Sequence, residues 1–275
     1  MNMHPKTVEG FGFEWTRFDQ SALPEEDLCH IFDGYFRIFP WDKLSPDAVG
    51  FDLGCGSGRW AKRVAPRVGI LHCIDASAEA LSSARRNLSQ QTNCIFHNAS
   101  VDEMPIEDGS MDFGYSLGVL HHVPDTLAAI RACVAKLKAG APFLIYLYYA
   151  LDNRPFWFRG IWRITDAVRM VVSRLPYGTK SVISEAIAVC IYFPLARVSR
   201  VVEGLGIPVA SFPLSAYRNR SFYTMRTDAF DRFATQMEKR FTAKQIQTMM
   251  TAAGLERISF NDRESYWCAL GYRRT

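Results

Sequence analysis

The sequence is most easily classified by what it lacks. Its 275 residues contain no long run of Lys or Arg and carry a formal net charge of only +4, so no nucleic-acid partner is expected. Seven cysteines form no CxxC pair and no zinc-type spacing with histidine, which predicts reduced thiols in a cytoplasmic protein. The N-terminal residues lack the charged and apolar regions of a signal peptide, and none is expected.

Long hydrophobic runs are also missing. The strongest apolar stretch, AIAVCIYFPLA at 186–196, is too short to span a bilayer and contains Pro194, so a transmembrane helix is not predicted. With 48% hydrophobic and 22% charged residues, the composition fits one large globular domain, or one domain with an elaborate insertion.

The pattern of residues changes along the chain and predicts three regions. Residues 1–48 are rich in aromatics and are expected to form a cap or lid of short helices rather than a core. Residues 49–150 alternate short apolar runs with amphipathic stretches, which is typical of parallel βαβ units, and 241–275 return to this rhythm. Residues 151–240 interrupt it with helices rich in Trp and Arg, predicted to form a helical insertion that covers an acceptor site.

Residues 241–275 also contain signals for where a helix and two strands begin and end. Thr242 is a suitable N-cap for the helix that follows it, and Gly254 a suitable C-cap. The segments LERISF and SYWCALGYRR are expected to be the final two strands. The predicted fold is therefore α/β: a Rossmann-like, doubly wound, mostly parallel seven-stranded sheet with an aromatic N-terminal cap and a large helical insertion after strand five.

A glycine-rich turn, FDLGCGSGRW at 51–60, follows the first apolar run. Glycines allow a ligand to approach the backbone closely at the start of a helix. A dinucleotide site would have a third glycine where Arg59 stands, which disfavours an NAD-dependent dehydrogenase. Asp75, which closes the next strand, is placed to accept hydrogen bonds from the ribose hydroxyls of an adenosine.

These residues resemble the class I S-adenosylmethionine-dependent methyltransferases of the small-molecule type. The similarity comprises the DxGxGxG element at 52–58, the acid at 75, the segment NASVDEMPIEDGSMDFGYS at 98–116 and the stretch LGVLHHVPD at 117–125. It implies S-adenosyl-L-methionine as cofactor, with the methionine part near Gly54 and Gly56, the ribose at Asp75 and the adenine edge at Val101 and Asp102. Ser100 departs from the acid that relatives often carry there.

The full set of cofactor-binding residues predicted from the resemblance follows the ends of the first four strands. It consists of Asp52, Gly54, Cys55, Gly56, Gly58, Asp75, Ala76, Ser100, Val101, Asp102 and Leu117. The NPPY or DPPY motif of enzymes that methylate amino groups on bases is absent, which disfavours nucleobase methylation. Quinone-type relatives hold a metal with carboxylates at the positions of Gly118 and His121, so no metal is predicted here.

Methyl transfer requires mainly proximity, orientation and exclusion of water. His121 and His122 follow the fourth strand and are candidate bases for a hydroxyl acceptor, although either could equally be a buried structural histidine. Tyr146 is a third catalytic candidate, and Tyr148 a candidate for acceptor contact, but half-buried strand tyrosines are the more common case. The segment GFGFEW at 10–15 is predicted to be a glycine-hinged lid whose Trp15 packs over cofactor or acceptor.

The insertion concentrates positive charge, with ten Lys and Arg against four acids between 151 and 220. Its helices are expected first to cover the active site. Peripheral contact of 151–204 with a membrane is the second hypothesis, and pairing in a homodimer is a third.

Residues 215–233 are expected to be too irregular for a core helix and to line the acceptor site through Tyr217, Arg218, Tyr223 and Arg226. Arginine clamps would suit an acidic acceptor, whereas pairing of these arginines with Asp228 and Asp231 is the alternative.

Two classes of function remain open on the sequence. The first is a methyltransferase acting on a small molecule, at oxygen, with an acidic or sugar-derived acceptor. The second is a module that binds the cofactor but serves as a membrane or partner adaptor without turnover.

Overall fold

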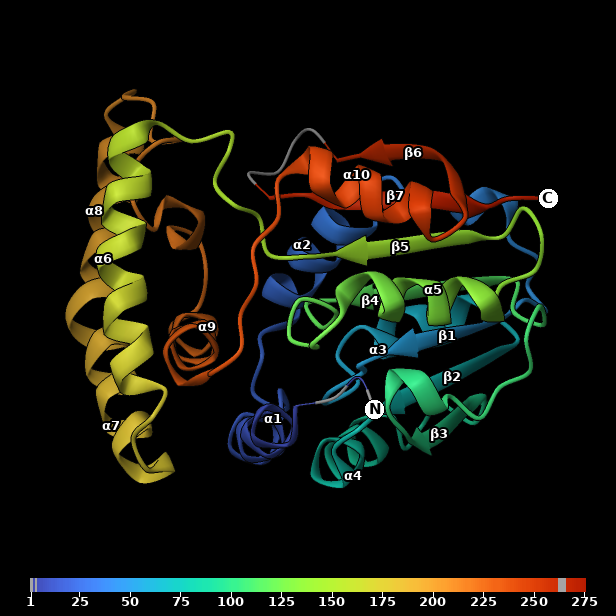
Figure 1. The fold of residues 1–275 in the computed structure, drawn as a ribbon. Coiled ribbons are helices and arrows are strands. Elements are labelled where there is room, and N and C mark those ends of the chain that lie inside the picture. Colours follow the sequence, from blue (N-terminus) through green and yellow to red (C-terminus); the bar gives the residue numbers. More distant parts are fainter. Residues whose placement is uncertain (1, 3, 262–265) are drawn as a thin grey trace. The chain divides into compact units, whose positions relative to one another are not determined.

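The computed structural model describes residue 2, residues 4–261 and residues 266–275. By its internal contacts the chain divides into two units (Figure 1). An α/β unit comprises 1–21, 30–152 and 237–275, and a helical unit comprises 22–29 and 153–236. The second helix, α2 (Glu25–Phe36), contributes its first turn to the helical unit and its remainder to the α/β unit.

A seven-stranded sheet forms the centre of the α/β unit, in the order β3-β2-β1-β4-β5-β7-β6. Strands β1 to β5 are parallel, and β7 is antiparallel to both β5 and β6. The order reverses between β1 and β4, which is where open α/β sheets bind ligands. The predicted Rossmann-like sheet is therefore confirmed. The strands are β1 (Val49–Leu53), β2 (Ile70–Asp75), β3 (Cys94–Asn98), β4 (Phe113–Leu117), β5 (Pro142–Tyr146), β6 (Leu255–Phe260) and β7 (Cys268–Arg273).

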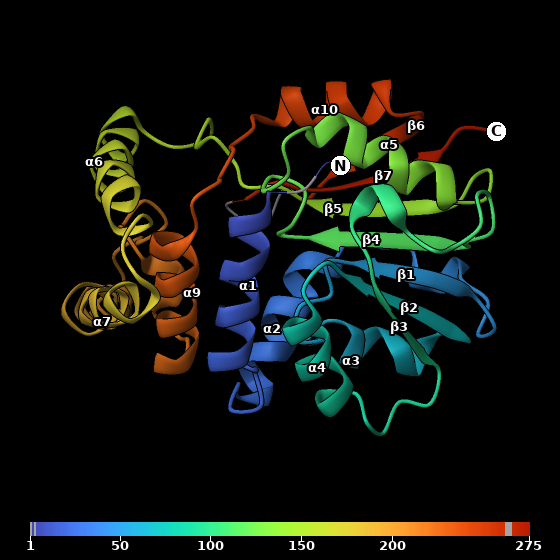
Figure 2. The ribbon, with the colours of Figure 1, turned by 60° about the horizontal axis from the view of Figure 1, so that its bottom comes forward.

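Helices cover both faces of this sheet, with α5 and α10 on one side and α3 and α4 on the other (Figure 2). The N-cap predicted at Thr242 is present and forms a capping box with Gln245, whose backbone amide donates to the Thr242 side chain, and Gly254 follows α10 with φ +95°. Ser265, where the last predicted strand begins, lies outside the described residues. The helices of this unit, beside α2, are α1 (Pro5–Arg17), α3 (Ala61–Val64), α4 (Ala78–Asn87), α5 (Thr126–Lys136) and α10 (Ala243–Ala252), with short 3-10 turns at Trp41–Lys43, Ala65–Arg67 and Val101–Glu103.

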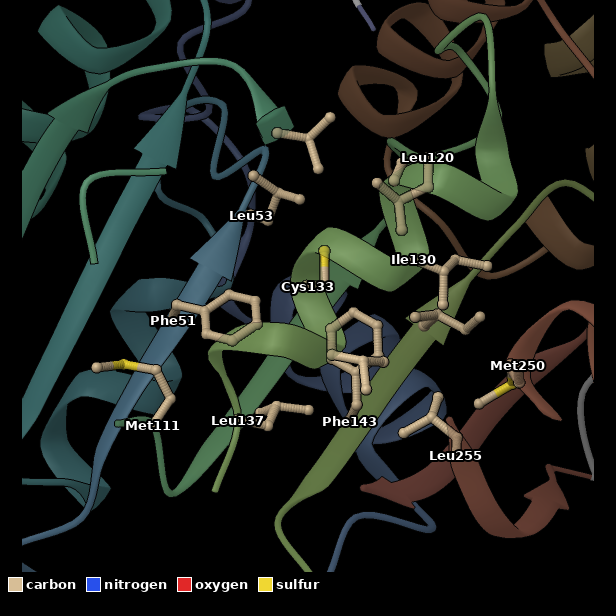
Figure 3. Close-up of a cluster of buried hydrophobic side chains, with 14 of the residues drawn as sticks. Phe51, Leu53, Met111, Leu120, Ile130, Cys133, Leu137, Phe143, Met250 and Leu255 are labelled. Atoms are coloured by element: carbon tan, nitrogen blue, oxygen red, sulfur yellow. The ribbon is translucent and has the colours of Figure 1, made fainter. Parts of the chain in front are cut away.

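The main core lies between the sheet, α5 and α10 (Figure 3). Phe51 of β1 and Phe143 of β5 have ring centroids 5.9 Å apart, and Ile130 of α5 is fully buried among them. Near-continuous apolar strands are what a sheet covered on both faces requires.

Part of the N-terminal region belongs to the core rather than to a cap. Phe36 packs edge-on against Tyr115 of β4, and Phe39 against Phe113 of the same strand. All four rings are at most 5% exposed. The expectation of a cap without core residues was therefore wrong from residue 32 on, because these aromatics seal one face of the sheet.

The helical unit contains α6 (Phe156–Val172), α7 (Tyr177–Ile187), α8 (Phe193–Gly204) and α9 (Phe222–Ala234). A π-helical turn at Ala188–Tyr192 joins α7 to α8, and a 3-10 turn occupies Ser215–Tyr217. Its own core is small and includes Val172, Tyr192, Met225 and Phe233.

One prediction for this unit was wrong. Residues 222–234 form a regular helix, because the Ser221 side chain caps its first turn and apolar residues recur at 225, 229 and 233 on its buried face. The apolar stretch 186–196 is part of a longer helix that runs from Tyr177 to Gly204, and among the described residues this helix alone is long and apolar enough to cross a membrane. Pro194 does not end this helix; it is the second residue of α8, which directly follows the π-helical turn.

Candidate functional site

The glycine turn after β1 has the backbone conformation that its sequence implies. Gly54, Gly56 and Gly58 have φ of +74°, +55° and +78°. These values lie in the left-handed region, which residues with a Cβ rarely adopt. The amides of Gly54 and Cys55 both donate to the carbonyl of Ile74, at 2.7 and 3.1 Å, so β2 holds the turn in place.

Two other segments approach this turn closely. A Cβ added at Gly54 would lie 2.3 Å from the Val119 side chain, in the loop that follows β4. A Cβ at Gly56 would lie 2.9 Å from the indole of Trp15 in α1. The glycine turn, the loop after β4 and the N-terminal helix are thus adjacent within the α/β unit.

Asp75 organises the polar side of the turn. Its carboxylate accepts a hydrogen bond from the Gly56 amide on one oxygen and from the Ser77 amide on the other, both at 2.9 Å. Burial raises the pKa of Asp75, and these backbone donors oppose the rise. Each carboxylate oxygen has a further lone pair, so the group can still accept from a ligand hydroxyl.

Asp52 is more deeply buried, with 1% of its surface exposed. Desolvation raises its pKa to about 8, and the nearby charge of Asp75 adds to this, while a hydrogen bond from the Tyr115 hydroxyl at 3.0 Å and the charge of Arg59 act against it. The site therefore contains a carboxyl whose charge would be stabilised by a cationic ligand.

The arrangement fits an adenosyl cofactor. The three glycines give the turn a positive-φ backbone without side chains, and Asp75 stands at the end of β2 beside it. The hydroxyl of Ser57, in the same turn, is buried without a hydrogen-bond partner among the described residues. A buried polar atom in this state costs about 1–3 kcal/mol unless a ligand or water satisfies it.

The remaining predicted cofactor residues lie at neighbouring strand ends. Ala76 follows β2, and Leu117, which is 7% exposed, ends β4. Ser100 caps the 3-10 turn that contains Val101 and Asp102, and its hydroxyl donates to Glu103 at 3.4 Å. The Asp102 carboxylate accepts a hydrogen bond from the backbone amide of Asn2. Their contacts with cofactor stay predictions.

The two histidines differ in how they are held. The Nδ1 of His122 donates to the carbonyl of Met237 at 2.5 Å, which fixes its tautomer. His121 is fully buried, and neither of its ring nitrogens has a hydrogen-bond partner among the residues that the structure describes. Burial, followed by the charges of His122 and Arg240, lowers the pKa of His121 well below 6.5, so its imidazole is neutral at pH 7.

Aromatic rings surround this pair. Tyr148 stacks on His121 with centroids 3.8 Å apart, and the Arg240 guanidinium lies 5.2 Å from the Tyr148 ring centre. Tyr146 lies 5.8 Å from Tyr148 and 5.0 Å from Tyr35 of α2. The predicted catalytic and acceptor-binding tyrosines after β5 are thus brought together with the histidines after β4.

The N-terminal segment forms helix α1 without a break at its glycines. Gly12 lies against the start of α4, since a Cβ there would be 2.8 Å from the Ser77 hydroxyl oxygen. Gly12 therefore permits close packing of two helices, and the glycine-hinged lid stays a prediction. Phe11 of α1 contacts the edge of His122 at 4.9 Å, and Arg59 lies 5.4 Å from the Trp15 ring centre.

The other predicted acceptor residues lie in the helical unit and are engaged there. Arg218 pairs with Glu203 at 2.6 Å, and Arg226 with Glu185 at 2.8 Å. Tyr217 packs against Tyr192 with centroids 5.3 Å apart, and Tyr223 is part of α9. The arginines thus pair with glutamates outside the segment, and their role in clamping an acidic acceptor stays a prediction.

Some residues of the site escaped the sequence analysis. Tyr115 holds Asp52, Val119 contacts the glycine turn, and the Met237 carbonyl orients His122. The register of β1 and β4 places Tyr115 beside Asp52, but pairing between strands 63 residues apart leaves no local signal. Tyr115 and Val119 lay within the stretches quoted for the resemblance, but neither was named as a site residue.

These features define a Rossmann-like domain with an adenosyl-cofactor site at the carboxyl ends of β1 and β2. Residues 51–145 match the model of a protein family that is described as "Methyltransferase domain". Over residues 51–145 the chain thus matches a methyltransferase domain, and the glycine turn and Asp75 fit S-adenosylmethionine as its cofactor.

Curated relatives include a ubiquinone biosynthesis O-methyltransferase from Xanthomonas campestris, 33% identical over 146 residues, which cover 52% of this chain and 61% of that one. Another is a 2-phytyl-1,4-naphtoquinone methyltransferase from Trichormus variabilis, 29% identical, with 49% and 62% covered. The chain thus spans less than two thirds of the length of these relatives. A solved SAM-dependent methyltransferase from Thermotoga maritima shares the fold, with a TM-score of 0.51, 12% identity and coverage of 96% and 100%.

Proposed function

We propose that the protein transfers the methyl group of S-adenosylmethionine to a hydroxyl oxygen of a small molecule. The names of the two curated relatives support a small acceptor, and that of the Xanthomonas protein supports oxygen. The observation that carries the proposal is the state of His121, a neutral, fully buried imidazole whose nitrogens have no partner among the described residues. An acceptor hydroxyl would supply the missing partner.

The cofactor, when bound, supplies an electrophilic methyl group on its sulfonium. The glycine turn and Asp75 would hold it, and the contact of Val119 with Gly54 brings the loop that carries His121 to the same place. One His121 nitrogen would accept the hydrogen bond of the acceptor hydroxyl and take its proton as the methyl group is transferred. Stacking on Tyr148 fixes the plane of the ring, which orients the nitrogens.

Turnover measurements with different acceptors test which chemical class of molecule the protein methylates. Formation of S-adenosylhomocysteine would be measured with a hydroquinone, a catechol and a uronic acid, of which the last represents the acidic, sugar-derived class predicted from the sequence. Turnover with any hydroxyl acceptor supports the proposal. Retention of cofactor with no turnover on any of them would favour the adaptor function instead.

The role of His121 is tested by His121→Phe, which keeps the stacking on Tyr148 and removes both nitrogens. We expect kcat to fall by about 100-fold or more, as for loss of a general base. Cofactor Kd should be unchanged, and the melting temperature unchanged or higher, because two unsatisfied polar atoms disappear. His97→Phe on β3 serves as the control and should retain full turnover. An unchanged kcat in His121→Phe would show that this histidine is structural.

A further inference from the structure

Exposed apolar side chains are concentrated in one part of the chain. All but two of the exposed large hydrophobic residues that the structure describes lie between Phe156 and Ile207, and the exceptions are Ile70 and Ile95. Several are largely exposed, such as Phe156 at 79%, Val182 at 70% and Leu205 at 73%. Exposed apolar surface on this scale is unusual for a monomer and marks an interaction site.

Helix α6 shows how this surface is built. Trp157, Ile161, Ile164, Val168 and Val171 recur at spacings of four and three, so they form one row along the helix, and all are exposed. The two buried residues of the helix, Arg169 and Val172, lie to one side of this row. The row itself is therefore turned to solvent, unlike the apolar stripe of an ordinary helix on a globular core.

Uncompensated positive charge lies on the other exposed sides of the same helices. Arg159 and Arg163 of α6 and Arg200 of α8 are exposed and form no ion pair with any residue that the structure describes. By contrast, every acid between 153 and 207 is paired, since Asp166 bonds Arg169, Glu185 bonds Arg226 and Glu203 bonds Arg218.

The helical stretch 177–204 continues the exposed surface with Val182, Val189, Phe193 and Val201. It has the length and composition of a membrane span, and little of its most apolar part is buried. The buried residues of this stretch include Lys180, whose Nζ donates to the carbonyl of Ala234, and Ser184. A helix whose packed side is polar in this way suits an interfacial position better than a position surrounded by lipid.

From these observations we propose that the exposed face of α6, α7 and α8 docks onto the surface of an anionic phospholipid bilayer. The apolar row would enter the acyl boundary, Trp157 would lie at the headgroup level, and the unpaired arginines would meet anionic headgroups. A second copy of the chain is a poorer occupant, because a symmetric contact would bring arginines together with no unpaired acid from this face to meet them. The proposal is independent of the methyl acceptor.

The test measures sedimentation of the full-length protein with vesicles of pure phosphatidylcholine and with vesicles that also contain phosphatidylglycerol. We expect binding to the anionic vesicles that weakens with salt. Replacing Arg159, Arg163 and Arg200 with Gln should weaken it roughly 100-fold, at about fivefold for each arginine. Replacing Ile161, Ile164 and Val168 with Gln should weaken it by about tenfold or more. The matched control, Ile70→Gln with Ile95→Gln, should bind as the parent does, and circular dichroism would verify that each variant is folded.

Three outcomes would overturn the proposal. The first is no binding of the parent protein to anionic vesicles, and the second is equal binding by the parent and both surface variants. The third is retention in the membrane after an alkaline carbonate wash, which would mean that 177–204 spans the bilayer. If the parent failed to bind vesicles and instead formed a dimer that the apolar variants disrupt, the same face would be a subunit interface.

Discussion

The α/β unit and the helical unit differ in how much apolar surface they leave exposed. In the α/β unit, Phe51, Ile130 and Phe143 are fully buried, and its function rests on a bare glycine turn at the sheet edge. In the helical unit, Arg169 and Lys180 are buried while residues such as Ile164 lie in solvent. The first unit is organised by its own core, whereas the second leaves apolar surface that only a further partner could bury.

The largest effect is expected from filling the glycine turn. Gly54→Val would place a side chain at φ +74° and against Val119, 2.3 Å from the ideal Cβ position. We expect cofactor affinity to fall by a factor on the order of 100 or more, because the turn must shift to relieve the contact. Isothermal titration with S-adenosylhomocysteine would measure it.

Gly140→Ala is a control that introduces the backbone strain of a positive φ without a steric contact. Gly140 also has a positive φ, +77°, but no atom lies within 4 Å of its added Cβ. This control should lose about 1 kcal/mol of stability from backbone strain and no cofactor affinity. Unchanged affinity in Gly54→Val would mean that the turn after β1 is not the cofactor site.

The next effect concerns the buried polar contacts of the helical unit. Arg169 pairs with Asp166 at 2.7 Å and donates to the carbonyls of Thr235 and Gln236. Arg169→Met would remove the stronger ion pair of the half-buried Asp166, whose contact with Arg232 is longer. It would also remove the hydrogen bonds that Arg169 donates to both carbonyls. We expect a loss of about 3 kcal/mol in unfolding free energy, measured by urea denaturation. Arg163→Met, on the exposed side of the same helix, should change it by less than about 0.5 kcal/mol. Equal losses of unfolding free energy in Arg169→Met and Arg163→Met would contradict the burial of Arg169 on the packed side of α6.

The pH dependence of stability probes the buried acid of the α/β unit. Because the pKa of Asp52 rises from 3.8 to about 8 on folding, the folded state holds a proton that the unfolded chain releases. This contribution to stability is complete at low pH and is lost as pH rises toward 8, at about 1.4 kcal/mol per pH unit.

Asp52→Asn should remove that slope from unfolding curves recorded between pH 5 and 8 without cofactor, and should make the apo protein more stable than the parent at pH 8. Asp42→Asn, an exposed control, should keep the parental slope. An Asp52→Asn variant with the same slope as the parent would show that this carboxyl is ionised in the folded protein.

Local signals explain which parts of the structure were predictable. The buried strands, the turn at Gly54 and the cap at Thr242 depend on residues close in sequence, and they were found. Helix α9 was missed although Ser221 caps it, because the tyrosines and arginines around it obscured the apolar period. The site's long-range contacts could not be predicted, since the pairing of Tyr115 with Asp52 and of His122 with Met237 joins residues 63 and 115 positions apart.

The smallest predicted effect tests the comparison between the units most directly. Ile130 in α5 and Ile164 in α6 both occupy helices, so the change in helix propensity on Ile→Val is the same, but their exposed fractions are 0% and 69%. Ile130→Val should cost about 1 kcal/mol, because a buried methylene is lost and a small cavity remains. Ile164→Val should change the unfolding free energy by no more than a few tenths of a kcal/mol in dilute solution. If Ile164→Val proved as costly as Ile130→Val, the α6 row would already be buried in solution, and a bilayer could not be what covers it.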